Sequence, residues 1–216
     1  MSAANSKEMQ EKARQLWMKR LSLSVYRQVK EQPVTKAAVS LVEALAGGDG
    51  GKICDSWGNL CAVLAAADCL DSLPGAIAEE VLGDDNVFSA ALSSGQKVSE
   101  RLAQGALRDL DVLWQVAGLS PIQAAVLMAD CHEVAETLPQ WGNLPAAAPM
   151  DKRWGKSLEA LESYHAVHGC GRFSKHIAFL WRDGQLLPVE HPDPIRLHNL
   201  KGYEYQRQIA VDNTRA

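Results

Sequence analysis

The chain has 216 residues, of which 47% are hydrophobic and 22% are charged, and its net charge is −4. This length favours one large domain or two small ones, and the apolar content excludes a generally disordered chain. The charge is uneven, because residues 1–36 hold eight Lys and Arg against three Asp and Glu, whereas residues 37–140 hold four against fifteen. We interpret the basic start as a solvated helix face docked on an acidic body, and not as a specific nucleic-acid site.

The cysteine content and the N-terminus indicate a reducing environment. The chain has five cysteines, an odd number, and they are too scattered for a disulfide framework. Cys54, Cys61 and Cys69 share one face of an Ala- and Leu-rich segment, which predicts buried thiols. The first residues lack the apolar core of a signal peptide, and no apolar run approaches the roughly 18 residues that span a bilayer. We therefore expect a cytoplasmic location and no membrane span.

Helical periodicity dominates the first two-thirds of the chain. A long amphipathic helix is predicted over 5–31, ended by Pro33, and a second over 35–46, stopped by GGDGG. A third helix is expected over 55–71, with Asp55 or Ser56 as its N-cap. Its CAVLAAADCL stretch is apolar almost all round, which predicts the central buried helix.

Proline and glycine divide the middle of the chain. Further helices are predicted from Pro74 to near Gly83, over 96–117, from a Ser120 N-cap and Pro121 to about 138, and over 151–167 with Gly169 at the end. GDDN at 83–86 reads as a loop. LPQWGNLPAAAPM at 138–150 carries three prolines and a glycine, which indicates a linker.

After Gly169 the period changes from that of a helix to that of a strand. HIAFLW and QLLPV flank Asp183-Gly184, which predicts a β-hairpin with Pro188 near the end of its second strand. We therefore expect a mainly α protein with a C-terminal hairpin and a final helix. The expected domains are a helical accessory domain (1–137), a linker (138–150), a connecting helix (151–175) and a hairpin with the following segment (176–216).

Two stretches imitate known motifs. AGGDGGKI (46–53) has the Gly-Lys pair of a Walker A loop, but Ala46 replaces its first glycine and Ile53 its metal-binding hydroxyl. We interpret it as a helix C-cap and a loop. WQVAGLSPIQAAVLMADCH (114–132) has the rhythm of a helix-turn-helix, but residues 120–138 contain acidic side chains and no Lys or Arg, so an ordinary helix pair is favoured.

A possible metal site needs His165, His168, Cys170 and His176, which lie within twelve residues. Imidazole and thiolate are zinc ligands by type, but this spacing matches none of the usual paired-ligand patterns. Histidines near a helix end also interact favourably with its dipole. We favour this second interpretation and predict no metal site. Cys131 and His132 are adjacent on a predicted helix, so they point apart and do not form a catalytic dyad.

The C-terminal 40 residues carry a more specific pattern. Residues 179–216 contain His191-Pro192-Asp193-Pro194, then Arg196-Leu197, Leu200 and Gly202, and finally Asn213-Thr214-Arg215. This pattern resembles the segment ahead of Walker A in the bacterial AAA+ superfamily ATPases known as domain of unknown function 815. The resemblance does not extend to residues 1–150.

The resemblance implies a nucleotide-linked role. In AAA+ modules the element similar to Leu200, Lys201, Gly202 and Tyr203 lies against the adenine, so these four residues are the expected cofactor-binding residues. No catalytic residue is expected, because the sequence ends before Walker A and Walker B and cannot position Lys, Mg²⁺ and water for phosphoryl transfer. ATP and Mg²⁺ are expected only for a full-length protein, with none bound tightly by this chain.

Two hypotheses follow. In the first, residues 1–175 recognise an unknown protein partner or substrate for an AAA+ core in cis, and this chain alone does not hydrolyse ATP. Apolar surface around Ile195, Leu197, Leu200, Tyr203, Ile209 and Val211 would then be exposed. In the second, the chain is a self-contained helical interaction module without a nucleotide site.

Overall fold

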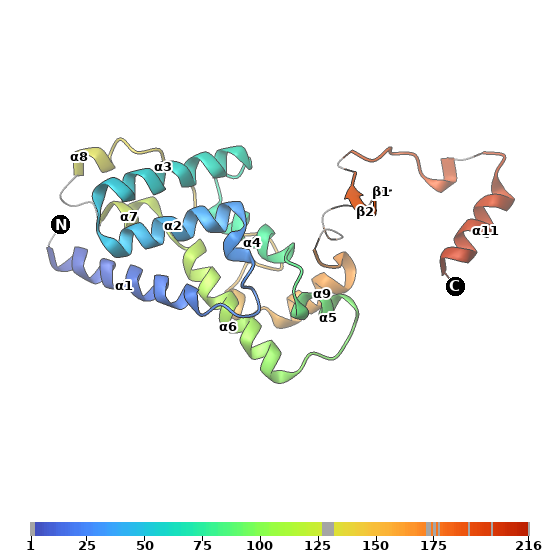
Figure 1. Ribbon diagram of the computed structural model, residues 1–216, viewed down its shortest axis with the longest axis horizontal. Coiled ribbons are helices and arrows are strands. Elements are labelled where there is room, and N and C mark those ends of the chain that lie inside the picture. The colour runs from blue at the N-terminus through green and yellow to red at the C-terminus, as the bar shows by residue number, and fades with distance from the viewer. Residues whose placement is uncertain are drawn as a thin grey trace. The chain divides into compact units, whose positions relative to one another are not determined.

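The computed structural model describes residues 3–126, 132–171, 174, 176, 178–189, 191–199 and 201–215. The chain divides into two compact units, Met1–Lys175 (unit 1) and His176–Ala216 (unit 2). Unit 1 is built from helices, and unit 2 holds a two-stranded antiparallel hairpin and a final helix (Figure 1). The predicted fold class, mainly α with a C-terminal hairpin and a last helix, is confirmed.

Helix α2 is the centre of unit 1. It lies between α1 and α3, packs along both, and also contacts α4 and α6 (Figure 1). The elements of unit 1 are α1 (Ala3–Leu21), the 3-10 helix η1 (Val29–Glu31), α2 (Pro33–Gly47), α3 (Gly50–Ala66), α4 (Leu73–Leu82), α5 (Val87–Ser93), α6 (Glu100–Ala117), α7 (Pro121–Val126), α8 (His132–Ala135), the 3-10 helix η3 (Trp154–Lys156) and α9 (Leu158–His168). Those of unit 2 are β1 (Phe179–Arg182), β2 (Gln185–Pro188), the 3-10 helix η4 (Leu197–Asn199) and α11 (Glu204–Arg215).

The expectation that the third helix is the most buried was wrong. Ten residues of α2 are buried, against five of α3. Ala62, Ala65 and Ala66 of α3 are exposed, and an exposed alanine leaves little apolar area in water. Of the three thiols expected to be buried, Cys61 is buried, while Cys54 and Cys69 are half-buried.

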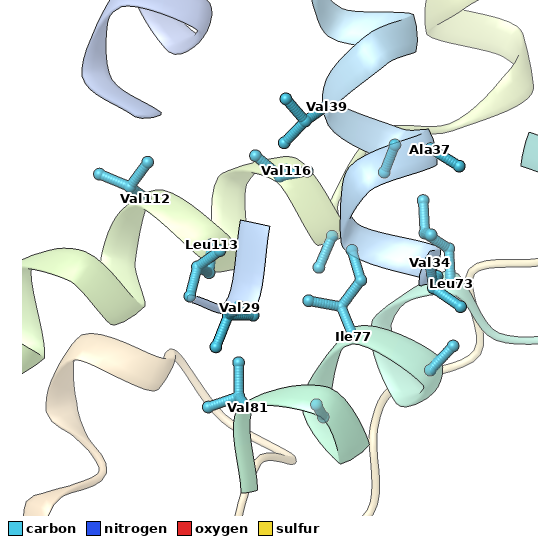
Figure 2. Close-up of a cluster of buried hydrophobic side chains, with 14 of the residues drawn as sticks. Val29, Val34, Ala37, Val39, Leu73, Ile77, Val81, Val112, Leu113 and Val116 are labelled. Carbon is cyan, nitrogen blue, oxygen red and sulfur yellow. The ribbon is translucent and has the colours of Figure 1, made fainter. Parts of the chain in front are cut away.

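The hydrophobic core joins residues that are distant in sequence. Figure 2 shows Val34 and Ala37 of α2 near Leu73 and Ile77 of α4, with Val29 of η1 beside them. Val112, Leu113 and Val116 of α6 complete this cluster. Helices of unit 1 thus bury their apolar faces against each other, as expected for a helical domain.

The first helix is shorter than the predicted 5–31, because α1 ends at Leu21. The backbone N–H groups of Ser22 and Leu23 still bond to carbonyls of α1, but those that follow bond outside it. Those of Ser24 and Val25 each donate to Asp109 Oδ2 at 2.7 Å, and that of Tyr26 donates at 3.2 Å. This carboxylate on α6 replaces the carbonyl partners of a continuing helix, so the chain turns. We call it the Asp109 clamp.

The loop between α2 and α3 has the predicted C-cap but a different N-cap. Gly48 adopts a φ of 74° and ends α2, as interpreted from AGGDGGKI. The side chain of Asp49 accepts from Lys52 N at 3.2 Å, so α3 starts at Gly50 and not after the predicted Asp55 or Ser56. Gly50 and Gly51 are poor helix residues, so the sequence itself gives little sign of this earlier start.

Helix α4 follows the prediction, with Pro74 in its first turn and Gly83 after its end.

Helix α5 was not predicted. Asn86 accepts from Ser89 N at 3.0 Å, and Ser89 Oγ accepts from Asn86 N at 3.0 Å, which forms a capping box. With seven residues, α5 is too short to show a clear period.

Helix α6 runs to Gly118 as predicted, although its N-cap is Ser99 and the predicted start was residue 96. Helix α7 starts at Pro121 as predicted. Continuity of this helix to about 138 is not tested, because residues 127–131, including Cys131, lie outside the described residues. Helix α8 ends at Ala135.

The segment 138–150, interpreted above as a linker, packs into unit 1. Its Trp141, Ala146 and Met150 are buried. The backbone of Gly142 bonds to Leu70 and Leu73, and a Cβ at Gly142 would collide with the Asp71 carbonyl. Two indoles also hold this segment, since Trp57 Nε1 donates to Pro139 O at 2.6 Å and Trp141 Nε1 donates to Leu119 O at 3.1 Å.

The predicted helix over 151–167 is in fact η3 followed by α9, which Gly169 ends as predicted. Trp154 is buried and its Nε1 donates to Met150 O at 2.9 Å. Next to it, Arg153 forms two 2.9 Å hydrogen bonds with the carboxylate of Asp111. These contacts hold the chain in a tight turn before the α-helix can begin.

The hairpin forms where it was predicted. Phe179 pairs with Pro188 and Arg182 with Gln185. Asp183 and Gly184 have φ values of 52° and 75°, as a two-residue type I′ turn requires. Pro188 is the last residue of β2, where its missing N–H costs no ladder bond.

Removing the clamp carboxylate is expected to destabilise unit 1 strongly. In D109A three backbone N–H groups lose their acceptor, which is expected to reduce the free energy of unfolding by at least about 3 kcal/mol in urea denaturation. The matched control is D55A, which removes the same charge from an exposed position of α3 in unit 1. Its loss is expected to be small, because an exposed surface charge contributes about 1 kcal/mol or less. Equal losses in the two variants would contradict the clamp.

Candidate functional site

The expected adenine-side residues lie in a turn between η4 and α11. Leu200 is outside the described residues; Lys201, Gly202 and Tyr203 are described and exposed. Gly202 has a φ of 80°, although a Cβ built there would meet nothing within 4 Å. Glycine is therefore required here by the positive φ of the backbone. It is not required by a close neighbour within the chain.

The side chains of Asp193 and Asn199 order the approach to this turn. Asp193 Oδ1 accepts from Ile195 N at 2.9 Å, and Asn199 Oδ1 accepts from Arg196 N at 2.8 Å. Such Asx contacts replace backbone partners where no helix or sheet exists. The lead-in to the turn is thus held by residues that are adjacent in sequence.

The start of α11 is fixed in the same local way. Glu204 Oε1 accepts from Gly202 N at 3.1 Å, and Arg207 Nη1 donates to Leu197 O at 3.3 Å. Backbone hydrogen bonds from Glu204 itself and from Gly202 lower the pKa of the Glu204 carboxyl, with the charge of Arg207 adding to this. The turn is therefore a preformed backbone feature with an ionised carboxylate beside it.

Apolar side chains of unit 2 are exposed along this segment, as predicted. Tyr203 is 60% exposed, Ile195 59%, Leu197 52% and Ile209 42%, while Val211 is half-buried. The hairpin adds Trp181 at 72% exposed. Apolar groups gathered in one short segment are typical of a surface that another element covers.

The four metal candidates contact other groups of the chain, and the rings of His165 and His168 both pack against Tyr164. His165 Nδ1 lies 2.8 Å from Gly169 O, and the ring of His168 stacks on Tyr164 at 4.5 Å. Cys170 Sγ lies 3.8 Å from Asp85 Oδ1, and His176 packs against Phe179. Among the described residues, no group of three or more His, Cys, Asp or Glu gathers in a metal-binding arrangement.

His165 is a buried imidazole at the end of α9. It is fully buried, and its Nε2 has no hydrogen-bond partner among the described residues. Because Gly169 O is an acceptor, Nδ1 carries the proton and Nε2 is bare in the neutral ring. Burial lowers the pKa of His165, and the bond to Gly169 opposes this only in part.

Two cavities border α1, and neither was predicted. One of about 830 Å³ lies against Arg14, Trp17 and Met18 of α1, and one of about 300 Å³ lies against Met9, Ala13 and Leu16. Their other walls come from α2, α3 and the end of α6. Sequence patterns describe one helix at a time, so they hold no signal for space between helices.

Comparison of the chain with family models, curated proteins and solved structures found no match. Within the described part of the chain, no helix is both long and apolar enough to cross a membrane.

Acidification is expected to destabilise unit 1 through His165. Its folded-state pKa lies below the ordinary 6.5, so the unfolded chain binds the proton more readily. Well above pH 6.5 the ring of His165 is neutral in the folded and the unfolded state, so it adds no pH dependence. As the pH falls below 6.5, the unfolded chain takes up the proton first and the free energy of unfolding decreases. Urea denaturation at about pH 7.5 and about pH 5.5 measures this loss.

Two variants test whether His165 causes the loss of stability on acidification. The loss on acidification is expected to shrink in H165L and to persist in H168Q, which changes an exposed histidine of the same helix. An unchanged loss in H165L would show that other groups cause it.

Proposed function

We propose that this chain is the partner- or substrate-recognition region of a bacterial, cytoplasmic AAA+ ATPase. In this proposal residues 1–175 recognise a protein, and residues 176–216 lead into an ATPase core that follows in a longer chain. The chain itself lacks Walker A and Walker B sequences and does not hydrolyse ATP alone.

The observation that carries the proposal is the exposed apolar segment of unit 2. Ile195, Leu197 and Tyr203 flank a turn whose conformation requires Gly202. A base is a flat apolar ring with polar edges, so backbone groups and an apolar side chain suit it. This arrangement agrees with the adenine-side role that the sequence resemblance implies for Lys201, Gly202 and Tyr203, whereas ATP and Mg²⁺ would need the core as well.

The alternative is a self-contained helical interaction module without a nucleotide site. The core of unit 1 favours it, because buried residues from η1 to α9 form one cluster within residues 1–175. Such a core does not need unit 2 for its completion.

The gene beyond codon 216 is expected to encode a strand followed by G-x-x-x-x-G-K-[ST]. The longer polypeptide should then bind ATP, and G202A should weaken the affinity by about tenfold or more, measured by calorimetry. The matched control is G184A, which has a similar positive φ and open surroundings in the hairpin. A stop codon after 216 in intact genomic sequence, or equal affinities in the two variants, would favour the alternative.

Hydrogen exchange of the present chain tests whether α11 is exposed when the proposed ATPase core is absent. Its residues 204–212 are exposed or half-buried, so their amides are expected to exchange at least about a hundredfold faster than those of residues 55–66. In the longer polypeptide this difference should decrease because the core covers the helix. Equal protection of both segments in the present chain would contradict the proposal.

A further inference from the structure

Helix α1 packs on the rest of unit 1, but none of its described side chains is buried. Residues 7–21 are all half-buried or exposed, and Ala13 and Leu16 are those that pack partly against the core. The neighbouring α2 buries ten residues. Since burial of apolar area is the main source of helix docking energy, α1 is held far more weakly than α2.

The two cavities lie on the two sides of this helix. Trp17 and Met18 line the larger one, and Ala13 and Leu16 line the smaller one. Atoms that face empty or water-filled space lose the close contacts of a packed interface. The docking of α1 therefore lacks close packing along both edges.

Two hydrogen-bond donors of α1 are buried without a partner among the described residues, which destabilises the docked helix. Trp17 Nε1 and Arg20 Nε are inaccessible to water, and the described residues offer them no hydrogen-bond acceptor. Each would regain a partner from water if the helix moved away, which favours the displaced state.

Polar contacts that hold α1 are exposed or partly buried. Gln10 Nε2 and Arg14 Nε donate to Ala46 O at 3.4 and 3.1 Å, and Arg20 lies 3.4 Å from Glu43. An exposed ion pair adds little to the docking of a helix, whereas the partly buried hydrogen bond from the charged Arg14 adds more.

The Asp109 clamp follows α1 directly. Ser24, Val25 and Tyr26 are bound to Asp109, and both Leu23 and Tyr26 are buried. The chain is thus held firmly at Ser24–Tyr26, directly after the weakly docked α1. Displacement of α1 therefore need not disturb η1 or α2.

From these contacts we propose that α1 is a displaceable arm that swings about Leu21–Ser22 and covers one face of α2 when closed. Opening joins the two cavities and uncovers Val42, Ala44 and Leu45 of α2, which line them. This inference does not depend on the proposed function.

Hydrogen exchange of the full chain tests the arm. Amides of residues 7–21 are expected to exchange at least about tenfold faster than those of residues 36–46. L16A should accelerate exchange in α1 about tenfold further and leave α2 unchanged. The matched core variant V81A, at a fully buried position of α4, should accelerate α2 and leave α1 unchanged.

Either of two results would overturn the proposal. One is equal protection of α1 and α2 in the native chain. The other is acceleration of both helices by the same factor in L16A, which would show that α1 opens only when unit 1 unfolds as a whole.

Discussion

The structure of unit 1 depends on one carboxylate, that of Asp109. It accepts three backbone N–H groups from the turn after α1, and the guanidinium of Arg108 lies 2.8 Å from its other oxygen. Because these donors are buried or half-buried, water does not replace the carboxylate. This turn directs Tyr26 and Val29 into the core and sets where α2 begins. The packing of α2 against α3, α4 and α6 follows from that position.

A second carboxylate acts in the same way at the start of α2. Glu80 of α4 accepts from Val34 N and Thr35 N at 2.8 and 2.9 Å. The N-terminus of the central helix is thus capped by another helix, since Gln32 at the N-cap position makes no side-chain bond to it. Caps of this kind connect secondary structure to tertiary structure, because neither helix end is satisfied until both helices are in place.

Local signals were enough to predict much of the fold. Asp183-Gly184, Gly118, Gly169 and Pro121 each act through their own backbone preferences, and the turn, the two helix ends and the helix start that they mark were predicted at their observed positions. A distant group set the limit that was predicted wrongly at Leu21, whereas local caps at Asp49 and Asn86 set the starts of α3 and α5 that were missed. For the candidate site, the sequence identified the turn and its exposed apolar neighbours. The cavities beside α1 and the burial of His165 depend on how helices meet, which no single-sequence period contains.

The Pro-rich segment 138–150 has a consequence for the order in which unit 1 can be completed. Trp57 Nε1 of α3 donates to Pro139 O, and Leu73 N donates to Gly142 O. On the ribosome, α2, α3 and α4 therefore emerge long before these partners do. Until the segment is synthesised, two donors near the centre of unit 1 remain unpaired and the indole of Trp57 lacks Trp141 beside it. A stretch that looks like a spacer thus bonds to residues made 72 and 82 positions earlier, before η3 and α9 add their own buried side chains.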